Sequence, residues 1–97
     1  MSGTYDVIVV GAGITGASTA YHLKRQGVKK VLLFERRAPA SGGTGKTAGM
    51  VRQHYSTPLA ARLSKESIHM FAAMPEELGA SGGYVAAGYV LLVPAHM

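Results

Sequence analysis

Apolar positions in the first third of the chain follow the order strand, helix, strand. Residues 7–10 and residues 31–34 are uninterrupted apolar runs, typical of buried parallel strands. Between them, residues 14–26 predict a helix whose apolar side is formed by Ile14, Ala17, Ala20, Tyr21 and Leu23. Gly27 is expected to stop this helix in a left-handed conformation. The pattern therefore predicts an α/β protein that begins with a βαβ unit.

A second helix is predicted over residues 56–74. Ser56 or Thr57 is expected to cap it, and Pro75 to end or bend it. Its helically spaced apolar side chains are expected to lie in the core; they are Leu59, Leu63, Ile68, Met70, Phe71 and Met74. Farther on, the runs 84–86 and 89–93, joined through Ala87-Gly88, predict a β-hairpin.

The turn after the first strand carries the first chemical signal. Residues 11–16 read GAGITG and match the pattern GxGxxG between a strand and a helix. Gly11 permits a tight exit from the strand, Gly13 lets a pyrophosphate approach the backbone, and Gly16 lets the helix lie close to the strand. The N–H groups at the helix start and the helix dipole favour an anion there. These features predict a dinucleotide site.

An acid completes this fingerprint. Glu35 ends the second strand, nineteen residues after Gly16. A carboxylate there can accept hydrogen bonds from the two hydroxyls of a ribose, and it repels a 2′-phosphate, which argues against NADP. The fingerprint alone does not separate FAD from NAD, so an NAD-binding module remains an alternative.

The loop that follows holds a second candidate phosphate motif. Residues 40–47 read ASGGTGKT, a relaxed triphosphate-loop pattern in which Ala40 replaces the first glycine and Lys46-Thr47 take the last two positions. Residues 35–39 separate this motif from its strand, which argues against it, but the alternative of a P-loop protein stays open. A short helix is possible over residues 46–52.

Composition and charge narrow the class of protein. The chain has 97 residues, a formal charge of +5 and no cysteine, so a disulfide framework and a thiolate metal site are excluded. Four cations, Arg36, Arg37, Lys46 and Arg52, follow the second strand, where an anionic cofactor would lie. No nucleic-acid motif accompanies them, and no run reaches the roughly 20 apolar residues of a membrane span. We expect a soluble, cytoplasmic protein without nucleic-acid or membrane partners.

The chain resembles the N-terminal segment of the D-amino-acid oxidase superfamily of FAD-dependent oxidoreductases, in its sarcosine and dimethylglycine oxidase or dehydrogenase branch. The resemblance spans nearly the whole chain and is carried by four stretches: YDVIVVGAGITGASTAYHL, KKVLLFER, GGTGKTAGMVRQHYS and GYVAAGYVLLV. It implies a Rossmann-like FAD-binding unit, with residues 1–83 as the N-terminal part of the FAD-binding domain. Residues 84–97 would begin the sheet of the substrate domain.

The resemblance also implies site residues. Those that would hold the FAD pyrophosphate are Gly11, Gly13, Ile14, Thr15 and Gly16. Those on the adenosine side would be Glu35 at the ribose and Arg36 along the adenine. Those expected at the pyrophosphate or ribityl chain are Gly43, Thr44 and Gly45. Those expected near the isoalloxazine ring are Gly49, Met50 and Arg52, with His54 and Tyr55 behind them.

Two departures from the family pattern shape the expected function. Some relatives attach FAD through a histidine where this chain has Lys46, so the flavin is expected to be bound non-covalently. Family members are several times longer, and their substrate-facing residues come later in sequence. We therefore expect an incomplete, FAD-binding fragment or small subunit of an enzyme that oxidises the CH–NH group of a secondary or tertiary amine or amino acid. Its partner would be the remainder of the enzyme or a larger subunit, and a non-catalytic relic remains an alternative.

Overall fold

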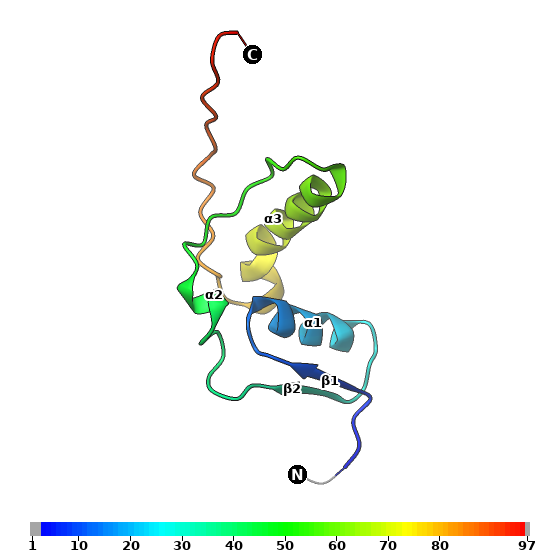
Figure 1. Ribbon diagram of the computed structural model, residues 1–97. Coiled ribbons are helices and arrows are strands. Elements are labelled where there is room, and N and C mark those ends of the chain that lie inside the picture. Colours follow the sequence, from blue (N-terminus) through cyan, green and yellow to red (C-terminus); the bar gives the residue numbers. More distant parts are fainter. Residues whose placement is uncertain (1–2, 97) are drawn as a thin grey trace. The chain divides into compact units, whose positions relative to one another are not determined.

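The computed structural model describes residues 3–96 (Figure 1). Its elements are β1 (Val7–Val10), α1 (Ile14–Arg25), β2 (Val31–Phe34), α2 (Gly43–Lys46) and α3 (Pro58–Leu78). The chain divides into two compact units, Met1–Gly49 and Met50–Met97, and each is described by itself.

The first unit is the predicted βαβ arrangement. β1 and β2 pair in parallel, with Val7 opposite Val31 and Val10 opposite Phe34. α1 connects them and packs on one face of this two-stranded sheet (Figure 1). Val9 lies on the covered face, because a Cβ placed on Gly16 of α1 would be 3.5 Å from the Val9 Cγ1 atom. The expected α/β class and the bounds of both strands are confirmed.

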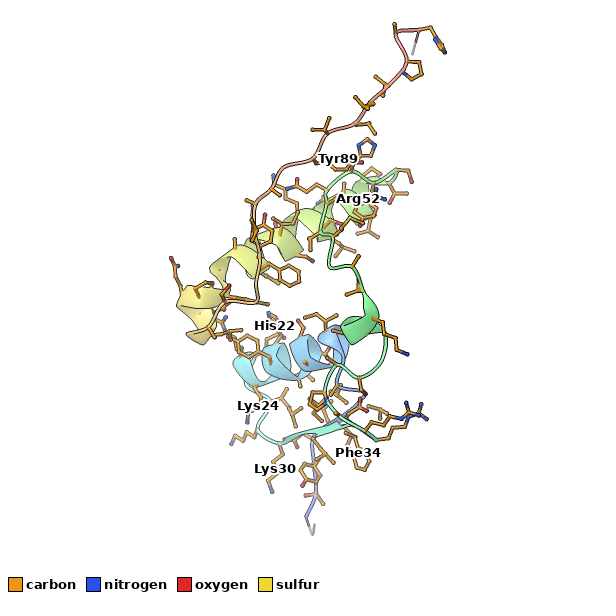
Figure 2. The ribbon with its side chains drawn as sticks, turned by 90° about the vertical axis from the view of Figure 1, so that its left-hand side faces the viewer. His22, Lys24, Lys30, Phe34, Arg52 and Tyr89 are labelled. Atoms are coloured by element: carbon orange, nitrogen blue, oxygen red, sulfur yellow. The ribbon has the colours of Figure 1, made fainter. Side chains whose placement is uncertain are left out.

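The opposite face of the same sheet is exposed. Ile8, Val10 and Phe34 are 57%, 84% and 54% exposed, and Phe34 points away from α1 in Figure 2. The sequence predicted strands buried on both faces, which is typical of parallel sheets. Within the described residues only Ala12, 6% exposed, is a buried hydrophobic residue.

α3 in the second unit begins as predicted and ends later than predicted. The Thr57 hydroxyl accepts a hydrogen bond from the Ala60 N–H at 3.2 Å, and Pro58 occupies the first turn. Pro75 lies inside the helix, which continues to Leu78 and stops at Gly79, where φ is 76°. The left-handed glycine therefore ends the helix, because Pro75 removes one N–H donor without stopping the turn that follows.

The apolar stripe of α3 is only partly covered. Ile68, Phe71 and Met74 are half-buried, whereas Leu59, Leu63 and Met70 are 68%, 61% and 47% exposed. The expectation that the whole stripe forms a core is therefore wrong for the first two turns of the helix and for Met70.

The predicted β-hairpin over residues 84–93 is absent. The described residues after Gly79 contain no strand, and Val85, Val90 and Leu92 are exposed. A two-stranded hairpin is marginal in water unless it packs against another layer. Two apolar runs of three and five residues therefore do not establish a ladder by themselves.

Two further sequence expectations were tested by the backbone. The short helix anticipated over residues 46–52 instead spans Gly43–Lys46 and precedes an extended segment. In the part of the chain that the structure describes, no helix combines the length and the apolar character needed to cross a bilayer.

Candidate functional site

The glycine turn is fixed to the ends of both strands. Gly11 leaves β1 with a φ of 104°, which favours glycine, and its N–H donates to the Phe34 carbonyl at 2.7 Å. A Cβ on Gly16 would collide with the Gly11 carbonyl oxygen. The close approach of α1 to the turn therefore requires glycine at position 16, as the sequence pattern predicted.

α1 begins without a side-chain cap of its own. Gly13 is the N-cap residue and has no side chain to accept a first-turn N–H. The Ile14 N–H donates instead to the Thr44 hydroxyl oxygen at 2.9 Å, across thirty residues of sequence. The N–H groups of Thr15 and Gly16 belong to the same first turn, whose N–H groups have no acceptor within a helix. The helix start is therefore a cluster of donors next to a residue without a side chain.

Glu35 faces this turn from the end of β2. One carboxylate oxygen accepts the Ala12 N–H at 3.0 Å and the other accepts the Arg37 N–H at 2.9 Å. These two backbone bonds, the Ala12 bond first, lower the pKa of Glu35, and the charges of Arg36 and Arg37 act in the same direction. Glu35 is therefore ionised at neutral pH. Each oxygen accepts one of these N–H bonds and keeps capacity for another donor.

The loop between β2 and α2 folds back onto the glycine turn. The Ala40 N–H donates to the Ala12 carbonyl at 2.9 Å, and Ala40 adopts a left-handed φ of 61°. A Cβ on Gly45 would collide with the Ala40 carbonyl oxygen, so this glycine allows α2 to pack against the loop. Together these contacts place Thr44 beside Gly13.

The P-loop alternative is not supported by this arrangement. In a P-loop the glycine-rich segment leads from a strand into a helix that begins near the lysine. Here the helix α2 has only four residues and ends at Lys46 instead of beginning there, and Lys46 is exposed. The segment packs on the dinucleotide turn instead of forming a separate phosphate loop.

The predicted site residues fall into two groups. The first unit brings together Gly11, Gly13, Ile14, Thr15, Gly16, Glu35, Thr44 and Gly45 around the start of α1. Arg36 follows Glu35 and is exposed, and Gly43 begins α2. Gly49 ends the first unit with a φ of 71°, whereas Met50 and Arg52 belong to the second unit.

Arg52 lies in an aromatic cluster of the second unit. Its guanidinium carbon is 5.1 Å from the centre of the Tyr55 ring, and Tyr89 lies close to it (Figure 2). A hydrogen bond to Tyr55, followed by the charge interaction with Tyr89, raises the pKa of Arg52. The His54 ring meets the Tyr89 ring edge-on, with 5.7 Å between centres. This cluster ties residues 52–55 to the extended segment around Tyr89.

Sequence reasoning missed two participants. Ala12 supplies an N–H to Glu35 and a carbonyl to Ala40, and its place between two glycines of the fingerprint was the available signal. Tyr89 was assigned to the hairpin, and nothing in its spacing indicated a contact with Arg52 or His54.

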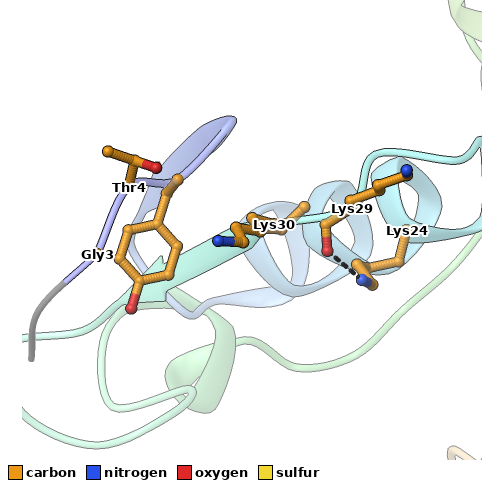
Figure 3. A pocket seen from close by; sticks show the side chains of 7 residues that line it. Gly3, Thr4, Lys24, Lys29 and Lys30 are labelled. Atoms are coloured by element: carbon orange, nitrogen blue, oxygen red, sulfur yellow. Dashed lines mark hydrogen bonds between the residues drawn. The ribbon is translucent and has the colours of Figure 1, made fainter.

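A surface hollow at the other end of the sheet is unrelated to this turn. It is lined by Gly3, Thr4, Lys24, Lys29 and Lys30, together with Tyr5 and Val31 (Figure 3). The Lys24 ammonium donates to the Lys29 carbonyl at 2.6 Å. The hollow adjoins the start of β2, whereas the glycine turn follows the end of β1. Residues 3–96 contain no group of acidic or histidine side chains arranged to hold a metal ion.

Comparison with known families identifies the group to which this geometry belongs. The family model described as FAD dependent oxidoreductase matches residues 6–96. The chain belongs to this family. Its cofactor is accordingly FAD, which confirms the expected cofactor and the resemblance to amine-oxidising flavoproteins. The choice between FAD and NAD that the fingerprint left open is thereby resolved.

Individual relatives agree with this assignment. Sarcosine oxidase subunit beta of Rhodobacter capsulatus is 32% identical over 91% of this chain and 22% of its own length. Human mitochondrial dimethylglycine dehydrogenase is 29% identical over 90% of this chain and 10% of its own length. The mitochondrial pyruvate dehydrogenase phosphatase regulatory subunit of Mus musculus has the same identity and coverage. The chain thus spans about a fifth or less of the length of these relatives, and no solved structure gives a significant match.

The residues at the turn fit the dinucleotide part of FAD. The space that a side chain on Gly13 would fill adjoins the Thr44 hydroxyl, at 2.9 Å from its oxygen. First-turn N–H groups suit a diphosphate, and an ionised Glu35 suits ribose hydroxyls. Donors for the anion and an acceptor for the sugar therefore lie at the same end of the sheet.

Proposed function

We propose that this chain forms the diphosphate-binding part of the FAD-binding domain of an oxidoreductase that acts on the CH–NH group of a secondary or tertiary amine or an amino acid. The observation that carries the proposal is the meeting of Gly13, Ile14, Thr44 and Glu35 at the start of α1. Family membership adds the cofactor, and the sarcosine and dimethylglycine relatives suggest the class of substrate.

In this proposal the first unit holds the nucleotide half of FAD. The backbone of residues 11–16 surrounds the diphosphate, and the dipole of α1 stabilises its charge. Glu35 binds the adenosine ribose while it keeps its bonds to Ala12 and Arg37, and Arg36 extends along the adenine. Gly43 and Gly45 let α2 approach the phosphates closely.

The residues that follow the loop would serve the other half of the cofactor. Gly49 and Met50 approach the isoalloxazine ring, and Arg52 lies near its edge, oriented by Tyr55 and Tyr89. Because Lys46 stands where some relatives carry a flavin-linked histidine, the flavin is bound non-covalently. When bound, FAD supplies the acceptor for two electrons from the carbon beside the amine nitrogen. No residue of this chain is assigned as a general base.

The partner in this proposal is the remainder of the flavoenzyme or a larger subunit. Residues 1–83 belong to the FAD-binding domain, and residues 84–97 begin the substrate domain, where they acquire their sheet partners. The exposed side chains of Val85, Val90 and Leu92 support this, because apolar strands need such partners to form a ladder. The enzyme acts in the cytoplasm.

A flavin titration tests the cofactor part of the proposal. FAD is titrated into the 97-residue chain, and flavin fluorescence and near-UV circular dichroism are followed. Weak, saturable binding is expected, which Gly13→Val removes and Gly42→Ala leaves intact, because a side chain fits at position 42 and not at position 13. NAD titrated in the same way should not bind. Preferential binding of NAD, or no flavin binding by a folded chain, would contradict the proposal.

A second candidate function is a non-catalytic regulatory role. It is favoured by the mouse relative, which is named as a regulatory subunit and matches 90% of this chain at 29% identity. Anaerobic addition of sarcosine or dimethylglycine to the flavin-loaded chain, together with the remainder of the flavoenzyme, distinguishes the oxidoreductase from the regulator. Bleaching of the flavin absorbance supports the oxidoreductase, and unchanged absorbance in a loaded protein supports the regulator.

A further inference from the structure

The surface hollow beside the start of β2 carries an excess of positive charge. Residues 24–30 contain four cations and no acid. Three of these cations, Lys24, Lys29 and Lys30, line the hollow (Figure 3). Asp6 lies next to them, but one of its carboxylate oxygens already accepts the Lys30 N–H at 3.0 Å. Three ammonium groups therefore face a single carboxylate at this end of the sheet.

The backbone around the hollow is held on both sides. The Asp6 and Val7 N–H groups donate to the Lys30 carbonyl at 2.9 and 3.3 Å, which ties the segment before β1 to the start of β2. After α1, the Gly27 N–H donates to the Lys24 carbonyl at 3.1 Å, and Gly27 has a φ of 98°. The lysines are therefore carried by a hydrogen-bonded turn and a strand end.

The ammonium groups have donors to spare. A lysine ammonium has three N–H donors and no acceptor. Lys24 gives one of them to the Lys29 carbonyl at 2.6 Å, which fixes its side chain across the turn. Among the described residues, none accepts a hydrogen bond from the ammonium of Lys29 or Lys30, and all three lysines are exposed. The hollow suits a ligand that brings several anionic oxygens.

The size and shape of the charged surface select the kind of ligand. One exposed ion pair contributes little, because water and salt screen it, so recognition here needs several carboxylates held together. Non-specific binding to duplex DNA uses about six to ten phosphate contacts, which is more than three lysines supply. A bilayer is flat and meets a concave surface poorly, whereas the side chains of an acidic peptide can project into it.

We propose that the hollow formed by Lys24, Lys29 and Lys30 docks an acidic segment of a partner protein, whose carboxylates pair with the lysine ammonium groups. The glycine turn and Glu35 follow the other ends of β1 and β2, so the acidic segment and a cofactor can be bound at the same time. This inference does not depend on the proposed function, because it concerns different residues.

A peptide titration tests this docking site. A peptide of six glutamates is added to the isotope-labelled, full-length 97-residue chain at low salt, and the amide NMR signals are followed. Saturable shifts are expected at residues 4–6 and 28–31. The double variant Lys29→Gln/Lys30→Gln should bind the peptide about fivefold more weakly, because it removes two of the pairing charges. Raising the salt concentration should also weaken binding, because these charges are exposed.

The double variant Arg37→Gln/Lys46→Gln is the matched control. It removes the same net charge from two exposed side chains that follow β2. Its affinity for the glutamate peptide should change by less than about twofold, because exposed charges away from the peptide are screened. Circular dichroism establishes that each variant is folded, and the single variant Lys30→Gln replaces Lys29→Gln/Lys30→Gln if the latter is not.

Each outcome supports or overturns the docking site. Equal weakening by the two double variants overturns it, because net charge alone would then explain the binding. Absence of saturable binding to the original chain at low salt overturns it as well, and so does equal binding of a neutral peptide of six glutamines. Tighter binding of duplex DNA or of phosphatidylserine vesicles at the same lysines would assign the hollow to a nucleic acid or a membrane instead.

Discussion

The two longer helices of this chain begin in opposite ways. α3 is capped locally by Thr57, whose hydroxyl accepts the Ala60 N–H three residues later. α1 begins at Gly13, which offers no side chain, and Thr44 from another element serves its first N–H. In α3 the N-cap side chain itself accepts a hydrogen bond from a first-turn N–H, which is the usual way to stabilise a helix start. α1, whose start is the proposed diphosphate site, instead has a glycine N-cap and takes the partner of its first N–H from α2.

Among substitutions that test this difference between the helices, one at Gly16 should change the free energy of unfolding most. Gly16→Ala places a methyl group against the Gly11 carbonyl oxygen, so α1 must move away from β1. We expect a loss of about 3 kcal/mol or more in the free energy of unfolding, the upper range for overpacking. Urea unfolding followed by circular dichroism measures it. Gly42→Ala is the control, because nothing lies within 4 Å of a Cβ there; equal losses in both variants would show that α1 does not need the close contact.

The contact between α1 and the sheet should give the next largest effect. Val9 faces α1 and is half-buried, whereas Val10 on the other face is 84% exposed. Val9→Thr places a hydroxyl in that contact and should lower the free energy of unfolding by roughly 1–3 kcal/mol. Val10→Thr has the same shape and strand position and should change it by less than about 0.5 kcal/mol. A larger loss for Val10→Thr than for Val9→Thr, measured in the same urea experiment, would mean that α1 covers the face that carries Val10.

Removing the local cap of α3 should have a smaller effect. Thr57→Ala eliminates the bond to Ala60 and should reduce stability by about 1 kcal/mol, together with some helical circular dichroism signal. Ser56→Ala, one residue earlier, is the control and should leave both unchanged. If Ser56 proved to be the more sensitive position, the helix would begin earlier than the structure indicates.

The smallest expected change in stability concerns Glu35 and is confined to acidic pH. The pKa of Glu35 is lowered in the folded chain from its ordinary value of 4.5, so its ionised form stabilises the fold above that value. This stabilisation should disappear as pH falls below about 4.5 towards the lower folded pKa. Glu35→Gln should flatten the dependence of stability on pH in that range. An unchanged acid profile in Glu35→Gln would argue that the bonds to Ala12 and Arg37 do not favour the charged form.

The features that could be predicted from the sequence are those whose cause is local. Gly11 and Gly16 were assigned correct roles, because a positive φ and a close helix–strand approach each demand glycine at a fixed offset. Both strands were placed to the residue, since β1 and β2 are apolar runs flanked by turn residues. Glu35 was placed beside the turn by its position at the end of β2.

The features that escaped prediction depend on partners distant in sequence. The runs around Val85 and Val90 resemble β1 and β2 in composition, yet only β1 and β2 have a ladder partner and a covering helix. The partnership of Thr44 with Ile14 follows from the path of a loop that no periodicity describes. The aromatic contact between His54 and Tyr89 joins segments with no spacing rule between them.

Ala40, in the loop between β2 and α2, adopts a left-handed backbone conformation. A left-handed alanine costs roughly 1–2 kcal/mol relative to the right-handed form, and here one backbone bond, from the Ala40 N–H to the Ala12 carbonyl, holds the residue in it. If that hydrogen bond opens, Ala40 can return to a right-handed or extended conformation, and this conformational energy is released. The loop between β2 and α2 therefore holds conformational strain that opening of this backbone hydrogen bond would release.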